Sequence, residues 1–258
     1  MNLPDPAEVV QQTMYNIAAA PRRNWPFPHI VVENVFPPAF YERLIAALPP
    51  AERFKALTET GRVKGVSATD PYSNRLIIEM SRPQPELLPE DHRELWAGFL
   101  DWLMGERFGL FMLQQFGAQV SRRFGNKINE VRLFRDFLMV RDRTDYALGP
   151  HTDGPQKVVV MLFYLPADAT HPELGTSFYV PREEGRVCEG NRHYDREEFL
   201  RVATMPYKPN TMVAFFKNAR SFHGVEPVTG QGLERRLIQF SIWHALGTGD
   251  DIAPVPRE

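Results

Sequence analysis

The sequence has few of the features that secreted and membrane proteins use. Cys188 is the only cysteine among 258 residues, so no disulfide can form within the chain, and this fits a reducing cytoplasm. No segment approaches the roughly 18 consecutive apolar residues of a membrane span. The N-terminus also lacks a charged stretch followed by an apolar one. We therefore expect a cytoplasmic protein without a leader peptide or a membrane segment.

An excess of charge of one sign is also lacking. The chain has 30 basic and 32 acidic residues and a formal net charge of −2, so its charge gives no reason to expect a nucleic-acid partner. Hydrophobic residues make up 43% of the chain and charged residues 24%, which is typical of a folded globular protein and not of a disordered one. We expect a single domain, residues 1–258, with a substantial core.

Hydrophobic patterning indicates two regions within this domain. The first, residues 1–127, is predicted to be a support region with helices at 5–19, 38–48 and 89–116 (two helices) and strands at 29–35 and 75–79. The rest of residues 52–88 is irregular, which in a compact domain is often functional or mobile. The second region, residues 128–245, is predicted to be the catalytic core, with strands at 129–141, 157–165, 202–206, 211–216 and 234–244.

The predicted fold class follows from these strands. We expect a mainly β protein with flanking helices, built on a jelly-roll or cupin-like core, the double-stranded β-helix. Residues 181–195 are polar and contain glycine, so we expect an excursion that lies over the mouth of the barrel. A capping-box pattern at Asp195–Glu198 predicts a short helix to Arg201.

A motif with metal chemistry stands in the second region. His151 and Asp153 are two positions apart, so on an extended segment both side chains project from the same side. A third ligand must come from elsewhere, and His223 is the best candidate. Two imidazoles and one carboxylate form the facial triad of non-haem Fe(II) oxygenases, which leaves positions open for a co-substrate and oxygen. We therefore predict an iron site, and interpret the other histidines, including His193, as structural or surface residues.

The surroundings of this motif resemble a known family. The motif precedes the apolar run Lys157–Leu165, and the run Pro209–Phe216 leads into His223 and then the pair Arg235-Arg236. In its order and spacing this succession, over residues 128–245, resembles the Fe(II)/2-oxoglutarate-dependent dioxygenases, the double-stranded β-helix oxygenases that include prolyl hydroxylases.

The resemblance implies a ligand set and a reaction. His151, Asp153 and His223 would be the iron ligands. 2-Oxoglutarate and O₂ would be consumed, succinate and CO₂ released, and an unactivated C–H bond of a small-molecule substrate hydroxylated. A related halogenase group lacks the carboxylate ligand, so the presence of Asp153 favours hydroxylation.

The co-substrate needs a cation for its distal carboxylate. Arg235 and Arg236 are adjacent, so on a strand only one of them faces the interior, and we favour Arg235. A buried guanidinium forms a bidentate pair with a carboxylate. The resemblance to prolyl hydroxylases adds Tyr164 as a hydroxyl that binds the same carboxylate. The family often has a serine two positions after this arginine, and Leu237 stands there instead.

The substrate and its binding residues stay open. Arg141 and Arg143 precede the motif and are candidates for binding an anionic substrate, with solvated loop arginines as the alternative. Besides a small-molecule substrate, two alternatives are a peptide side chain, bound in a groove at residues 52–88, and a non-enzymatic jelly-roll binding module with structural histidines.

Overall fold

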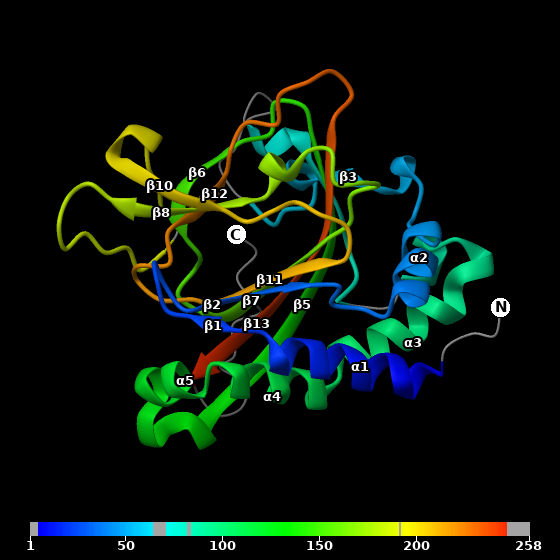
Figure 1. Ribbon diagram of the computed structural model, residues 1–258, viewed down its shortest axis with the longest axis horizontal. Coiled ribbons are helices and arrows are strands. Elements are labelled where there is room, and N and C mark those ends of the chain that lie inside the picture. Colours follow the sequence, from blue (N-terminus) through cyan, green and yellow to red (C-terminus); the bar gives the residue numbers. More distant parts are fainter. Residues whose placement is uncertain (1–4, 64–70, 82–83, 191, 247–258) are drawn as a thin grey trace.

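The computed structural model describes residues 5–63, 71–81, 84–190 and 192–246. Within these residues the strands form two antiparallel sheets that face each other (Figure 1). The larger sheet has the strand order β1-β2-β11-β7-β13-β5-β4-β3, and the smaller one has the order β10-β8-β12-β6-β9. The strands are β1 (Arg22–Arg23), β2 (His29–Glu33), β3 (Lys55–Ala56), β4 (Arg75–Glu79), β5 (Val131–Arg143), β6 (Leu148–Thr152), β7 (Lys157–Tyr164), β8 (Thr176–Pro181), β9 (Arg192–His193), β10 (Phe199–Thr204), β11 (Thr211–Phe216), β12 (His223–Val225) and β13 (Glu234–Leu246).

The strands of the core cross repeatedly from one sheet to the other. β5, β7, β11 and β13 belong to the larger sheet, whereas β6, β8, β10 and β12 belong to the smaller one. Two four-stranded layers connected in this order form a jelly roll, or double-stranded β-helix. The predicted fold class, a mainly β protein with flanking helices, is therefore confirmed.

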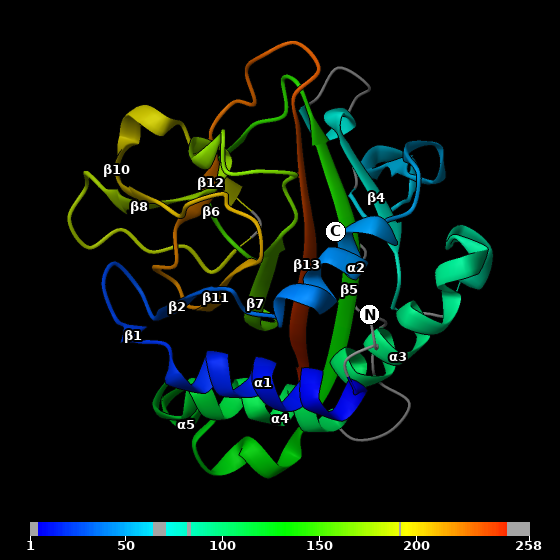
Figure 2. The same ribbon diagram turned by 45° about the vertical axis from the view of Figure 1, so that its right-hand side comes forward.

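Helices cover the outer face of the larger sheet (Figure 2). They are α1 (Pro6–Ala19), α2 (Pro38–Ala46), α3 (Arg93–Met104), α4 (Glu106–Gln115) and α5 (Gly117–Phe124). The sequence predicts two helices between residues 89 and 116 but not α5, which is short and begins at a glycine. Among the described residues, no helix is long and apolar enough to cross a membrane.

The larger sheet lies between two apolar layers. Its outward side chains, such as Phe137 and Phe240, pack with Trp96 and other helix residues. Its inward side chains, such as Val160 and Leu162, pack between the two sheets. Every residue of β7 and β11 is therefore buried, which explains why these strands have apolar runs and no alternation.

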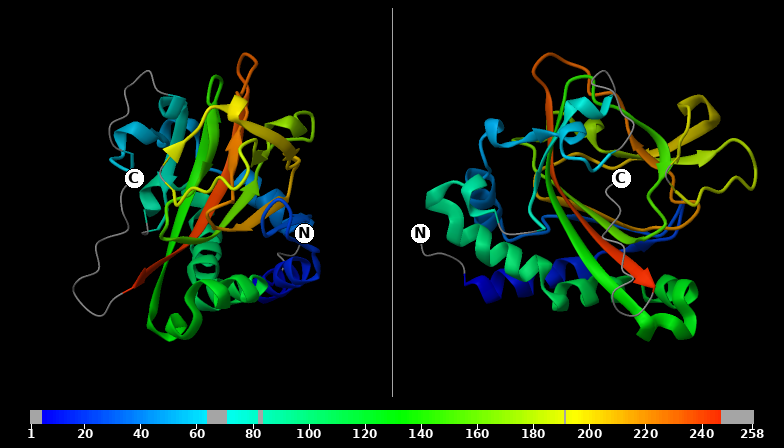
Figure 3. Two further views of the ribbon diagram at one scale, coloured as in Figure 1. Left: turned by 90° about the vertical axis from the view of Figure 1, so that its left-hand side faces the viewer. Right: turned by 180° about the vertical axis from the view of Figure 1, so that it is seen from behind.

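The pairing of β5 with β13 decides which of their side chains reach the interior. The two strands are in register from Glu234 opposite Arg143 to Leu246 opposite Val131, and Figure 3 shows them side by side along their length. Because side chains alternate along a strand, Arg235 and every second residue after it face the same way.

Around residues 176–204 the structure differs from the prediction. The sequence predicts no strand at β8, and the predicted helix to Arg201 is wrong, because only a 3-10 turn at Arg196–Glu198 precedes β10. β10 pairs with β8 from Phe199 onward, and the ring of Phe199 is buried against that of Phe222. Sheet pairing and burial override the local capping pattern.

Gly224 allows β12 to lie close to β6. A Cβ atom at this position would be 2.4 Å from the backbone oxygen of Leu148 and 3.0 Å from that of Gly149. β12 cannot simply move away, because it is held between β6 and β8. Backbone contact, and not a turn, is therefore the reason for glycine after His223.

We expect Gly224→Ala to lower the free energy of unfolding by about 1–3 kcal/mol, the usual cost of overpacking an interior. Urea denaturation measures this change. Gly98→Ala is the control, because Gly98 lies in α3 and an added Cβ meets nothing within 4 Å. It should be neutral or stabilising by up to about 1 kcal/mol. Equal stability of the two variants would contradict this account of Gly224.

Candidate metal centre and its cavity

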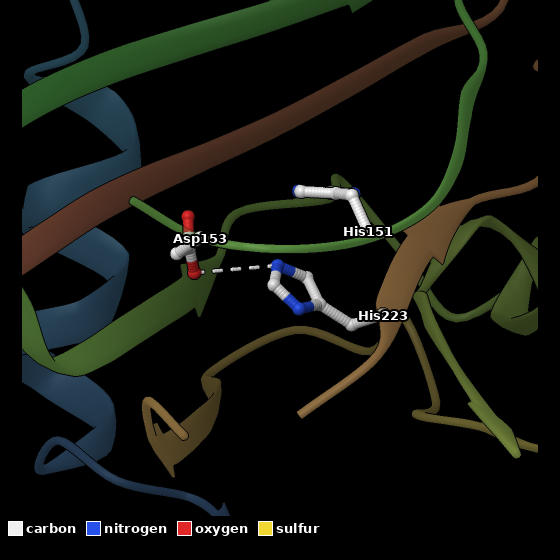
Figure 4. A group of neighbouring side chains, drawn as sticks. All are labelled: His151, Asp153 and His223. Atoms are coloured by element: carbon white, nitrogen blue, oxygen red, sulfur yellow. Dashed lines mark ion pairs between the residues drawn. The ribbon is translucent and has the colours of Figure 1, made fainter. Parts of the chain in front are cut away.

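The structure brings His151, Asp153 and His223 together. His151 lies on β6 directly opposite His223 on β12, and Asp153 follows β6 by one residue. One ligand atom from each residue lies within 4.8 Å of the other two. Figure 4 shows Asp153 facing the ring of His223, with Oδ2 of Asp153 3.5 Å from Nε2 of His223. The strand pairing thus brings together His151 and His223, which are 72 residues apart along the chain.

Each imidazole is oriented by a backbone carbonyl. Nδ1 of His151 is 3.0 Å from the oxygen of Gly149, and Nδ1 of His223 is 2.9 Å from the oxygen of Ser221. A carbonyl oxygen only accepts, so in both rings Nδ1 carries the hydrogen. The Nε2 lone pair of each neutral ring is then available to a metal, an arrangement that is usual for metal-binding histidines.

The carboxylate of Asp153 is held at one oxygen and open at the other. Its Oδ1 accepts a hydrogen bond from the ammonium of Lys157 at 2.5 Å. Its Oδ2 is buried and has no hydrogen-bond partner among the described residues. A buried carboxylate oxygen without a partner is costly, and a cation between this atom and the two Nε2 atoms would satisfy it. The donor set therefore fits a divalent metal.

The electrostatic surroundings keep the three ligands in their metal-binding protonation states. Burial lowers the pKa of His151 and of His223 below the ordinary value of histidine. Burial opposes the charged form of Asp153, but Lys157 and the two imidazoles outweigh it and hold the pKa of this carboxyl well below its ordinary value. Neutral imidazoles and an ionised carboxylate are what metal binding requires.

These ligands line a cavity of about 170 Å³ that also contains Arg235. The guanidinium of Arg235 is almost completely buried, with 1% of the side chain exposed. It donates from Nε to the oxygen of Leu174 at 2.6 Å, from Nη1 to Oδ2 of Asp142 at 2.8 Å, and from Nη2 to Oγ1 of Thr176 at 3.1 Å. Arg236 is only partly buried and does not line the cavity in the described part of the chain. The structure thus places Arg235 inside, as the sequence analysis favours.

Tyr164 does not reach the cavity among the residues that the structure describes. Its hydroxyl donates to Oγ1 of Thr176 at 2.9 Å and accepts from the backbone N–H of Thr176 at 2.9 Å. Thr176 belongs to β8, the strand that the sequence did not predict, and its hydroxyl oxygen accepts hydrogen bonds from both Tyr164 and Arg235. Tyr164 therefore contacts Arg235 in two ways, through the hydroxyl of Thr176 and directly, because the guanidinium carbon of Arg235 lies 5.5 Å from the centre of its ring. Its binding of the distal carboxylate stays a prediction.

Arg141 and Arg143 also lie away from the cavity lining within the described ranges. Alternation along β5 turns Asp142 inward and its two neighbours outward. Arg141 pairs with Glu234 and lies 5.4 Å from the ring centre of Phe54, and Arg143 is exposed. Their predicted role in substrate binding is thus not supported by their position.

Sequence reasoning missed several residues that do line the cavity. Lys157 contacts Asp153, and its ammonium lies 5.0 Å from the ring centre of Trp243. His193, interpreted from sequence as structural or surface, stacks on His151 with ring centres 4.7 Å apart, and its Nε2 is 3.0 Å from the hydroxyl of Tyr72. It lies in the excursion at 181–195, consistent with the expected place of that segment over the site. For Lys157, its position four residues after Asp153 was the available signal in the sequence.

We expect the metal-free protein to lose stability as the pH falls through about 6.5. Below this ordinary histidine pKa the unfolded chain binds protons at His151 and His223, whereas the folded chain does not, so unfolding is favoured. The contribution of Asp153, whose folded pKa is depressed, persists until the pH falls below 3.8. Urea denaturation of the wild type and of His151→Gln/His223→Gln between about pH 8 and 5 tests this. An equally steep pH dependence in the double variant would contradict it.

Lys157→Met tests the charge balance of the site. The side chains of Lys157 and Asp153 are 9% and 10% exposed, so the variant leaves a buried carboxylate unpaired. The metal-free variant should lose about 3–5 kcal/mol, as when a buried ion pair is broken. A bound metal supplies the missing positive charge, so added Mn²⁺ should raise the melting temperature more in the variant than in the wild type. Calorimetry with and without Mn²⁺ measures both effects.

Lys208→Met is the control for that experiment. Lys208 pairs with Glu33 at 3.1 Å, but their side chains are 43% and 55% exposed. Removing this surface pair should change stability by less than about 1 kcal/mol. A smaller response to Mn²⁺ in Lys157→Met than in the wild type would show that Lys157 does not balance Asp153.

Comparisons with known proteins give similar structures but no sequence relatives. No family model matches the chain, and no curated protein matches it. The structure is similar to an oxidoreductase of the 2OG-Fe(II) oxygenase family from Burkholderia pseudomallei, with 16% identity over 94% of this chain and 91% of that one and a TM-score of 0.44. It is similar to a prolyl-4-hydroxylase from Pseudomonas putida (13% identity, 93% and 98% covered, TM-score 0.42). It is also similar to SnoK, a non-haem alpha-ketoglutarate-dependent carbocyclase from nogalamycin biosynthesis (14% identity, 94% and 84% covered, TM-score 0.47).

Proposed function

We propose that this chain is an Fe(II)- and 2-oxoglutarate-dependent dioxygenase that hydroxylates an unactivated C–H bond of a small molecule. One observation carries the proposal: a single cavity contains both a donor set of two histidines and one carboxylate and a buried arginine. The donor set suits Fe(II) with coordination positions left open. The guanidinium suits the distal carboxylate of 2-oxoglutarate. A structural histidine cluster would not require the arginine.

The residues that would hold the metal are His151 and His223, through Nε2, and Asp153, through Oδ2. Bound iron, with 2-oxoglutarate and O₂, supplies an oxidative decarboxylation that yields succinate and CO₂ and hydroxylates the substrate. The chain's own contribution is orientation. The carbonyls of Gly149 and Ser221 fix the two rings, and Lys157 holds the second oxygen of the carboxylate.

The walls of the cavity support a small, partly apolar substrate. Val160, Leu162 and Phe215 contribute apolar surface, and Gln239 contributes an amide. The volume of about 170 Å³ lies below the roughly 300–1,000 Å³ of drug-sized ligand sites. Such walls exclude water from the reacting centre. A reducing cytoplasm, which we propose as the location, is supported by the single cysteine.

Anaerobic titration of the metal-free protein with Fe(II) and then 2-oxoglutarate tests the proposal. We expect a metal-to-ligand charge-transfer band that appears only when both are present, and succinate release once O₂ is admitted. His223→Ala and Asp153→Ala should each abolish the band. A wild-type protein that binds Fe(II) weakly or not at all, and releases no succinate, would favour the non-enzymatic binding module instead.

Arg235→Lys tests the co-substrate side of the cavity. The variant keeps the charge but loses the planar fork, so the affinity for 2-oxoglutarate should fall by about 1–3 kcal/mol. Isothermal titration of the Mn²⁺-loaded protein with 2-oxoglutarate measures it. Arg236→Lys is the matched control, because Arg236 lies on the opposite side of β13 and outside the described lining. Loss of affinity in Arg236→Lys alone would show that the wrong arginine was chosen.

A further inference from the structure

Arg235 is not the only arginine that contacts Asp142. Arg75 donates from Nε to Oδ1 of Asp142 at 2.6 Å and from Nη2 to Oδ2 at 2.9 Å, while Arg235 reaches Oδ2 at 2.8 Å. The side chain of Asp142 is fully buried, and that of Arg75 is 11% exposed. One carboxylate is thus shared by two guanidinium groups.

Strand register places Arg75, Asp142 and Arg235 side by side on three neighbouring strands, and we call these three side chains the arginine row. Arg75 on β4 lies opposite Asp142 on β5, and Asp142 in turn lies opposite Arg235 on β13. Both arginines line the cavity. Arg75 is further fixed by the ring of Tyr146, whose centre lies 4.4 Å from its guanidinium carbon. Arg75, Asp142 and Arg235 therefore form one connected group, and neither arginine is among the candidate metal ligands.

The charge balance explains why a second arginine is needed. Arg235 and Asp142 alone form a neutral pair, and a guanidinium already neutralised by a carboxylate attracts a second carboxylate only weakly. With Arg75 the row carries one net positive charge, which matches one ligand carboxylate. Within the described part of the chain, N–H donors also remain, because the hydrogen bonds described above use three of the five N–H groups of Arg235 and two of the five of Arg75.

We propose that Arg75, Asp142 and Arg235 together form the site for the distal carboxylate of the co-substrate, and that Arg75 is required to keep Arg235 available. The identity of the ligand as 2-oxoglutarate rests on the function proposed above. In this arrangement Arg75 engages both oxygens of Asp142, and the row presents its excess charge and free N–H groups to the ligand.

Charge restoration separates this role from a purely structural one. We compare the affinity of 2-oxoglutarate for Mn²⁺-loaded wild type, Arg75→Gln, Asp142→Asn and the double variant by isothermal titration. Arg75→Gln leaves a neutral row, so the affinity should fall about 10-fold to 100-fold, on the scale of one charged hydrogen bond. The double variant again has one net positive charge and should recover most of the loss. Asp142→Asn alone should bind at least as tightly as the wild type.

Two controls accompany this series. 2-Oxopentanoate has the same carbon chain without the distal carboxylate, so its binding should be insensitive to Arg75→Gln unless the cavity itself has collapsed. Arg141→Gln removes an arginine of β5 that pairs with a carboxylate, Glu234, outside the described lining, and should leave the affinity for 2-oxoglutarate unchanged.

Each outcome bears on one claim. If the wild type does not bind 2-oxoglutarate, the proposed function is contradicted. If the wild type and Arg75→Gln bind it equally while Arg235→Gln does not, the role of Arg75 is overturned and the function stands. If Arg75→Gln does not fold, the double variant decides, because it buries no unpaired carboxylate. A folded double variant that does not bind 2-oxoglutarate overturns the proposal.

Discussion

The antiparallel pairing of β6 with β12 is the constraint on which the candidate site depends. It sets His151 opposite His223, and the chain leaving β6 then carries Asp153 to the same point. The close approach of the two strands requires Gly224, since a side chain there would strike the backbone of β6. The smaller sheet therefore contributes the metal ligands, while the larger sheet contributes the floor of the cavity and its charged residues.

Buried charged side chains are paired at both ends of this cavity. Near the candidate metal centre, Lys157 pairs with Asp153, and at the other end Arg75 and Arg235 share Asp142. Each group still lacks a partner: among the described residues one oxygen of Asp153 has no hydrogen bond, and two arginines share the single carboxylate of Asp142. Buried charged groups that lack partners are costly. A divalent cation beside Asp153 and a ligand carboxylate beside Arg75 and Arg235 would reduce this cost. In the function proposed here, the metal would bind at the first of these ends and the distal carboxylate of 2-oxoglutarate at the second.

Much of this arrangement could be predicted from the sequence, because it depends on local pattern. The alternation of residues two apart put His151 and Asp153 on one side, and the apolar runs of β7 and β11 marked a sheet buried on both faces. The remainder depends on long-range pairing. Thr176 links the hydroxyl of Tyr164 to Arg235 because β8 joins the smaller sheet, and Arg75 meets Asp142 only through the register of β4 with β5. No residue near Arg75 in the sequence signals that contact.

The most direct test of the central claim, that one cavity holds both a metal and 2-oxoglutarate, is a crystal structure of the protein with Mn²⁺ and 2-oxoglutarate under anaerobic conditions. The account predicts that the metal is bound by Nε2 of His151 and His223 and by Oδ2 of Asp153. It also predicts that the distal carboxylate of 2-oxoglutarate lies against Arg235. A metal bound elsewhere, or 2-oxoglutarate absent from the cavity at saturating concentration, would contradict the account.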